Sequence, residues 1–393
     1  MGCFNKSLFL THLSFYMKRI YSVLLVALFV FWGQAVGQSK IFFPDRISHN
    51  LSMQEGDLYL SIANQNFFIN NEFSRPVVKG YTLPGQVFSP FLRYRPSQDF
   101  SIDAGLQLKH YFGIDEPVFV NPILTASLKM NSAITFRIGA INGNLNHRLS
   151  DIIYFDEIYF GAEPEYGVQF EVNTDRLWLD TWINWQEYIV EGDSVSEQFV
   201  AGLSAQVSLV KLGNGLQLTM PLQLMAFHKG GEIDASEASD RSEVNTLAGF
   251  DVEHKNDNAT TRWGGFAHVL LYKELKSKKT NVFKDGWGLE TGVTMRSRNH
   301  QVRISWWKGS EFLTENGNPI YQSVSDYSDE LVFPNTQILT GKYGWHKTFA
   351  PQLDFSFLLY GFYDIEQRVF SYSYGVQLLY SPSVFLKNLK MVR

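Results

Sequence analysis

The chain has 393 residues, of which 34 are basic and 39 acidic, giving a formal net charge of −5 at pH 7. This balance argues against nucleic acid as a partner. The one cysteine, Cys3, leaves the rest of the chain without a disulfide or a thiolate metal site, and we expect no cofactor.

The N-terminal segment has the layout of a Sec-type signal peptide. Lys18 and Arg19 precede the apolar run Val23–Trp32, and small residues follow up to Gly37. The run is shorter than the roughly 20 residues of a spanning helix, so cleavage after Gly37 is the better interpretation. We expect residues 1–37 to be an extension plus signal peptide, with translation starting at Met17, and residues 38–57 to be a short lead-in.

Hydrophobic alternation with a period of two dominates the chain that follows. In the run from Phe100 to Phe112, one parity is apolar apart from His110, and the other carries Asp103, Gln107 and Lys109. A tilted membrane strand needs nine to eleven residues, whereas globular strands most often have five or six. Runs of this length therefore predict an all-β, transmembrane, antiparallel up-and-down barrel over residues 58–382, with a short tail at 383–393.

About sixteen such runs occur, and a weakly apolar run near Val244 leaves fourteen to sixteen strands open. Tight turns alternate with longer polar loops, as expected for a barrel with its short turns in the periplasm. Pro90 and Pro221 lie inside runs and predict bulges. The runs begin near Leu58, Gln86, Phe100, Ile123, Ile134, Glu165, Leu177, Gln198, Leu216, Val244, Thr261, Trp287, Gln301, Thr336, Leu353 and Val369.

A C-terminal motif resembles the assembly signal of outer-membrane barrel proteins, with a polar residue, a glycine and then two apolar or aromatic residues at alternating positions. Its residues are Ser373, Gly375, Leu378 and Tyr380. In the family the final aromatic residue usually ends the chain, whereas here Ser381 to Arg393 follow it. The whole mature chain resembles uncharacterised porin-like barrels of Gram-negative outer membranes. The resemblance implies that location, contact with outer-membrane lipid and insertion by the barrel-assembly machinery, but no activity.

Charged residues of both signs fall on the parity expected to line the lumen. A sixteen-strand barrel is wide enough for an aqueous channel, so these charges favour a passive pore for small solutes, although they could also pair and seal it. The solute and the oligomeric state cannot be read from the sequence. The candidate lumen-lining residues are Arg93, Arg95, Asp103, Lys109, Arg137, Glu171, Asp180, Glu290, Arg296 and Arg303.

The loop from Asn142 to Glu165 interleaves acidic and aromatic residues. It could fold into the barrel as a constriction or bind a cation at the surface, but we favour an external loop that packs its aromatics on its neighbours. Acidic residues without Asp-x-Asp-x-Asp-Gly spacing do not specify calcium, and we assign no metal site.

Catalysis on lipid would require a serine nucleophile with a histidine base at the lipid-facing rim. The histidine candidates are His110, His147, His228 and His268, and none lies in a Gly-x-Ser-x-Gly or His-x-Ser-Asn arrangement. We therefore expect no enzyme and assign no catalytic residue. A barrel enzyme acting on lipid and a soluble secreted β-protein that binds carbohydrate remain the alternatives.

Overall fold

The computed structural model describes residues 53–389, apart from 116, 162, 214, 232–239, 256–259 and 278–281. The expected signal peptide and its cleavage point lie outside these residues. No helix in the described ranges is long and apolar enough to cross a membrane.

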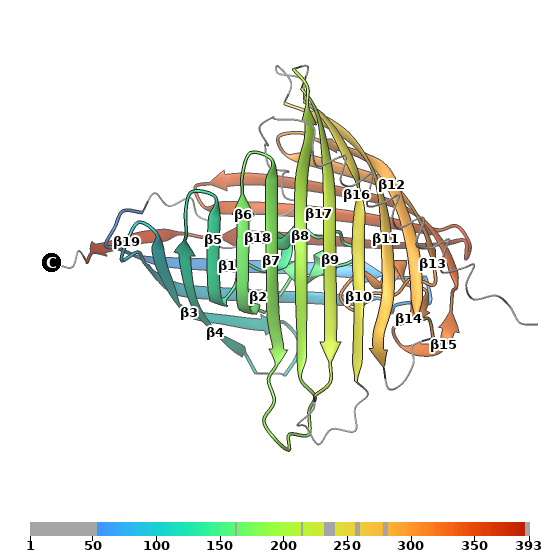
Figure 1. Ribbon diagram of the computed structural model, residues 1–393, viewed down its shortest axis with the longest axis horizontal. Helices are drawn as coiled ribbons and strands as arrows, with labels where there is room; N and C mark the ends of the chain where they lie inside the picture. Colours follow the sequence, from blue (N-terminus) through green and yellow to red (C-terminus); the bar gives the residue numbers. More distant parts are fainter. Residues whose placement is uncertain are drawn as a thin grey trace, which may run out of the picture.

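Among the described residues, sixteen antiparallel strands of a seventeen-stranded sheet form a closed wall, in which each strand pairs with the next wall strand along the chain and β18 returns to β1. In Figure 1, strands β8 and β9 of one wall cross β17 and β18 of another, as the strand tilt of a barrel requires. The predicted fold class is confirmed. The wall consists of β1 (Asp57–Glu72), β2 (Tyr81–Tyr94), β3 (Phe100–Tyr111), β4 (Phe119–Lys129), β5 (Ile134–Ala140), β6 (Tyr166–Asn173), β7 (Leu177–Glu187), β8 (Gln198–Lys211), β9 (Leu216–Lys229), β10 (Arg241–Lys255), β11 (Arg262–Ser277), β12 (Asp285–Arg296), β13 (His300–Ser310), β16 (Asn335–Ala350), β17 (Leu353–Asp364) and β18 (Val369–Tyr380).

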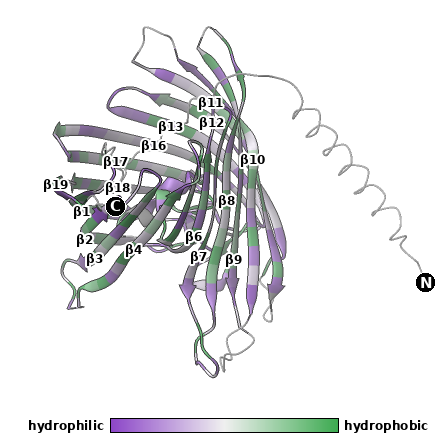
Figure 2. Cartoon of the chain, turned by 60° about the vertical axis from the view of Figure 1, so that its left-hand side comes forward, coloured by the Kyte–Doolittle hydropathy of each residue, from purple (hydrophilic) through white to green (hydrophobic). Residues whose placement is uncertain are grey.

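The alternation in the sequence places apolar side chains outside and polar ones inside. On β3, Leu106 is 45% exposed although it is apolar, while Gln107 is only 6% exposed. Hydrophobic and hydrophilic residues alternate along the strands of the wall in Figure 2. Large apolar side chains on the outer face indicate a lipid environment, because their exposure to water would be unfavourable.

The two prolines do not produce the expected bulges. Pro221 faces Gln206 of β8, and the register shift of this strand pair lies beyond it, between Ser208 and Val210 of β8. The pairing of β9 with β10 is interrupted beside Pro221 and resumes in the same register. The pairing of β2 with β3 is interrupted in the same way beside Pro90. A proline has no N–H to donate, and here the loss is confined to one side of the strand.

The expected C-terminal tail is in part a strand. Residues Ser383–Asn388 form β19, which pairs with β1 from Asp57 to Ser61. Strand β1 extends beyond the end of β18, so its first residues need another partner for their backbone groups. β19 supplies that partner.

The long connections lie at one end of the barrel, which we call the loop end; the tight turns lie at the other, the turn end. Three of them, 73–80, 141–165 and 311–334, reach the buried core. They contain η1 (Asn144–His147), η2 (Asp156–Tyr159), η3 (Pro319–Tyr321), β14 (Val324–Ser325) and β15 (Ser328–Val332).

The favoured external position of the Asn142–Glu165 loop is wrong. Ile152 and Ile153 are each 1% exposed and belong to one hydrophobic core with inward-facing Phe67 and Ile69 of β1. The ring of Phe160 lies 5.7 Å from that of Phe67. Burying these apolar side chains is favourable, and the lumen is where the loop can bury them. The three loops together plug the barrel, and we call them the plug.

Candidate functional site

The centre of the plug is His147, whose side chain is 0% exposed. Its Nδ1 lies 2.7 Å from Oδ2 of Asp180 on β7, and its Nε2 lies 3.0 Å from Oε2 of Glu165. The imidazole stacks on the indole of Trp182, with ring centres 3.5 Å apart. Gly202 of β8 makes room for this indole, because a Cβ there would lie 2.2 Å from it.

Electrostatics keep the His147 imidazole charged. Burial lowers the pKa of His147, but the carboxylates of Glu165 and Asp180 outweigh it and raise that pKa to about 9. Burial likewise opposes ionisation of Glu165, yet the imidazolium and the N–H of Asn144 hold the pKa of Glu165 below its usual value. Both ring nitrogens donate to carboxylates, so His147 has no free nitrogen with which to act as a base.

Two basic residues, Lys342 and Arg75, form further ion pairs between the plug and the wall. The ammonium of Lys342 on β16 lies 2.6 Å from Asp151 and 3.2 Å from Asp156 of the plug. The guanidinium of Arg75 lies 2.6 Å from Asp364 on β17 and donates to the carbonyl oxygens of Ile320 and Gln322. Each pair crosses from a loop to a strand, so the plug is anchored on several sides.

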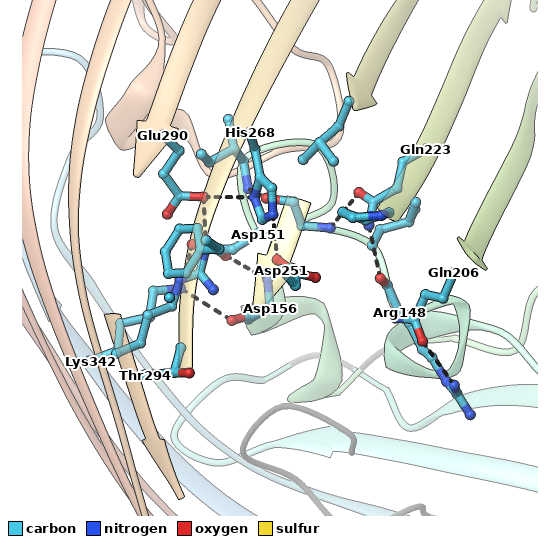
Figure 3. A pocket seen from close by; sticks show the side chains of 18 of the residues that line it. Arg148, Asp151, Asp156, Gln206, Gln223, Asp251, His268, Glu290, Thr294 and Lys342 are labelled. Carbon is cyan, nitrogen blue, oxygen red and sulfur yellow. Dashed lines mark hydrogen bonds and ion pairs between the residues drawn. The ribbon is translucent and has the colours of Figure 1, made fainter. Parts of the chain in front are cut away.

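A polar cavity of about 120 Å³ lies between the plug and the turn end. Figure 3 shows Glu290, His268 and Asp251 converging from neighbouring strands, with Arg148 beside Gln206 on the other side. Nε2 of His268 lies 2.8 Å from Asp251, and Arg303 lies 2.7 Å from Glu290. Basic and acidic side chains in the lining of the cavity are thus paired with one another.

Most of the candidate lumen-lining residues lie inside the barrel and contact a group of opposite charge. Arg93 pairs with Asp103 at 2.6 Å, Lys109 with Glu163 at 2.9 Å, and Arg137 with Glu171. Asp180 holds His147, and Glu290, Arg296 and Arg303 line the cavity.

Arg95 lies elsewhere. It follows β2 and donates to the carbonyl oxygens of Met53, Ser97 and Gln98 around the β2–β3 turn. The four residues of the predicted assembly signal lie on β18, with Ser373 and Gly375 facing inward and Leu378 and Tyr380 outward.

A serine and a histidine meet on the outer face of the wall. Nδ1 of His228, at the loop end of β9, lies 2.8 Å from Oγ of Ser242, its cross-strand neighbour at the start of β10. The ring of Phe199 lies 4.9 Å from the imidazole, and Trp185 stacks on Phe199 at 5.2 Å. This is the pairing of nucleophile and base that ester hydrolysis requires, and it faces lipid.

Sequence reasoning named His228 but missed Ser242, which is fourteen positions away in the chain. Only the strand register brings them together. Lys276 stands opposite Ser242 on β11, and its ammonium lies 3.3 Å from Asp240. Of the other candidates, His110 faces outward beside Gln86, and His268 lines the inner cavity.

Comparison with one solved structure supports the fold. The outer-membrane protein OprD from Pseudomonas aeruginosa superposes with a TM-score of 0.50 at 9% identity, covering 89% of this chain and 100% of that one. The outer-membrane protein OpdK from the same organism gives 0.49 at 11% identity, covering 84% and 100%. No curated protein matches the chain significantly.

The profile of the family described as Lipid A 3'-O-deacylase-type matches residues 50–389. This match overturns the expectation that the chain is no enzyme, because the family is named for a deacylase. The expectation relied on the lack of local serine and histidine motifs, and such a lack does not exclude catalysis by residues that only the fold brings together. The chain is a porin-like β-barrel of the outer-membrane type that belongs to the lipid A 3'-O-deacylase-type family.

Proposed function

We propose that this protein hydrolyses an ester-linked acyl chain of lipid A at the outer surface of its barrel. The observation that carries the proposal is the family match over residues 50–389. The Ser242–His228 pair gives the reaction a place, because it lies on the lipid-facing side at the loop end. Lipid A would reach it laterally, without entering the lumen.

Ser242 is the nucleophile in this proposal. Its Oγ attacks the ester carbonyl carbon while Nδ1 of His228 accepts the hydroxyl proton, so the neutral tautomer with its proton on Nε2 is required. The bond from acyl carbon to alcohol oxygen breaks, and the alcohol leaves with the proton from His228. Water then attacks the acyl-serine, releasing a fatty acid and restoring the serine.

The neighbours of the pair suit an amphiphilic substrate. Phe199 and Trp185 form an aromatic surface beside the imidazole, as expected where acyl chains meet headgroups. Lys276 is 65% exposed and stands opposite Ser242, where its charge would attract an anionic headgroup.

A passive channel for small solutes has less support. The plug places a hydrophobic core inside the barrel, and the inner charges pair with one another. We further propose export by a Sec-type signal peptide, insertion by the barrel-assembly machinery and residence in the outer membrane, with the loop end facing outward. These proposals rest on the sequence pattern and the barrel fold.

The test is release of fatty acid from purified lipid A by the full-length protein in detergent micelles. Wild type should release ester-linked chains, and Ser242→Ala or His228→Ala should lower the rate by about 10²-fold or more, the contribution of a positioned base. Thr246→Ala removes another outward hydroxyl on β10 and serves as the matched control. A fluorophosphonate probe should label wild type but not Ser242→Ala.

The outcomes separate the activity from its location. No release by a correctly folded wild type would refute the deacylase. Release that survives both substitutions would keep the deacylase and reject this pair as its site.

A further inference from the structure

The outer wall of the barrel carries one patch of amides where lipid tails are expected. Outward positions on β1 read Leu58, Leu60, Ile62, Asn64, Asn66 and Phe68, and Gln86 of β2 stands opposite Asn66. Nε2 of Gln86 donates to Oδ1 of Asn64 at 2.9 Å. We call Asn64, Asn66 and Gln86 the amide patch.

The patch lies far from both ends of the strand. Asn66 is six residues from the loop-end residue Glu72, and Asn64 is seven from Asp57. With a rise of about 3.3 Å per residue and a tilt of about 45°, these separations correspond to depths of roughly 14 and 16 Å. The amides are therefore near the middle of a bilayer, with Phe68 and Pro84 on one side and Ile62 and Phe88 on the other.

Two other outward polar side chains on the wall form hydrogen bonds within the barrel. The outward threonines Thr181 and Thr291 donate to the carbonyl oxygens of Gly202 and Phe266 on neighbouring strands, so their hydroxyls are satisfied. Many exposed outward residues elsewhere are apolar, for example Leu106, Leu124, Val293, Ile304 and Leu359. The exposed outward lysines Lys273 and Lys308 lie nearer the loop end of their strands.

The amide patch has unused hydrogen-bonding capacity. Three amides carry six N–H donors and three carbonyl acceptors. Within the described residues one side-chain bond joins Gln86 to Asn64, and the Asn66 amide makes none. An unpaired amide in hydrocarbon is costly, so this wall calls for a partner that can both donate and accept hydrogen bonds.

We propose that the amide patch is the interface through which two copies of this chain associate side by side in the membrane. Lipid headgroups lie at the bilayer surface and cannot reach mid-depth, and acyl tails cannot hydrogen-bond. The patch is uncharged, so it does not select an anionic or cationic partner. Amides donate and accept equally, so the same patch on a second copy is complementary to it about a two-fold axis.

Two features of the wall agree with this assignment. The pairing of β2 with β3 is interrupted at Ser89 and Pro90, close to the patch, and a second copy at the patch would cover this interruption. The Ser242–His228 pair lies on β9 and β10, halfway around the sixteen-strand wall from β1 and β2. Association through the patch would leave both copies of that pair facing lipid, and it does not depend on the proposed deacylase activity.

The experiment measures association in lipid nanodiscs and by native mass spectrometry of the full chain. Replacing Asn64, Asn66 and Gln86 together by leucine should lower the association constant by about tenfold or more. One hydrogen bond between membrane helices contributes up to about tenfold, and this patch can form several between two barrels. Thr246→Leu changes an outward polar residue on the opposite wall and should leave association unchanged. Heat-modifiable gel mobility reports that each variant folds.

A second measurement does not depend on the triple variant. In a Cys3→Ser background, Asn66→Cys should form a homodimer with a short bismaleimide crosslinker in membranes. Leu271→Cys, at an exposed outward residue of β11 on the opposite wall, should not. A monomeric wild type in nanodiscs at high protein density would overturn the proposal. So would an Asn66→Cys crosslink to a different protein, or equal crosslinking at both positions.

Discussion

Replacing His147 by alanine should release the plug while leaving the barrel wall intact. The substitution removes a cation held by two buried carboxylates, those of Asp180 and Glu165, and also the stacking on Trp182. Removing one partner of a buried ion pair costs about 3 to 5 kcal/mol. Raising the pKa of His147 to about 9 from its usual 6.5 corresponds to a similar figure, about 3 kcal/mol.

This energy should appear as local rather than global unfolding, because the wall has its own closed ladder of hydrogen bonds. Hydrogen exchange with mass spectrometry should show amides of 141–165 losing about 10² to 10³-fold protection in His147→Ala. Strands β8 to β12 should keep their amide protection, because their backbone hydrogen bonds stay paired even where their side chains gain freedom to shift. His300→Ala, at an exposed histidine bonded to Tyr343, is the matched control. Unchanged protection of the plug, or an equal loss in every strand, would refute the reasoning.

The pH dependence of plug protection follows from the signs of the two shifts. The folded pKa of His147 is raised, so its contribution is complete below about 6.5 and is lost as the pH rises through about 9. The folded pKa of Glu165 is lowered, so its contribution is present above about 4.5 and is lost as the pH falls through the lowered value. Protection of 141–165 should therefore be greatest between about 4.5 and 6.5 in wild type, and this maximum should disappear in His147→Ala.

Three other predictions follow from the wall and the plug. Burial raises the pKa of Glu157 to about 7, so the protein loses stability as the pH rises from about 4.5 to 7 and this carboxyl must ionise. Glu157→Gln should therefore raise the melting temperature above that of wild type at pH 8, and by less at pH 4.5. Leu106→Arg should cost about 2 to 4 kcal/mol in a folding titration into lipid vesicles, whereas Gln107→Arg should insert nearly normally; equal costs would contradict the assigned faces. Wild type should give no steady conductance in planar bilayers, and deleting 145–160 should produce discrete steps; open steps in wild type would show that the plug does not seal the lumen.

The wall of the barrel was readable from the sequence because one physical constraint acts on every strand. A residue facing lipid must be apolar and its neighbour facing the lumen need not be, so parity alone separates Leu106 from Gln107. All sixteen predicted runs have a strand in the structure, although β2 begins at Tyr81, five residues before the predicted start.

The plug was not readable in the same way. An apolar loop segment such as Ile152–Ile153 indicates burial but not the surface that buries it, and a single sequence carries no such information. The partners of His147 show the difficulty, because Glu165 is in the same loop but Asp180 is on strand β7, 33 positions further along the chain. The outward Ser242–His228 pair was hidden for the same reason.

The filled lumen and the polar groups on the outer wall both indicate that this barrel acts through its outer surface. A pore needs an inner wall whose charges are free to meet a solute, but here Asp180, Lys342 and Glu290 are each committed to a protein partner. A lipid hydrolase needs a rigid wall that holds two side chains at a fixed separation against the bilayer, and a packed interior supplies rigidity by restricting how far neighbouring strands can shift. Loosening the plug with His147→Ala should therefore lower acyl release at Ser242 without touching either residue of the pair, if the site is the one proposed. Acyl release that is unchanged while exchange in 141–165 accelerates would separate the plug from the chemistry and leave it with a sealing role alone.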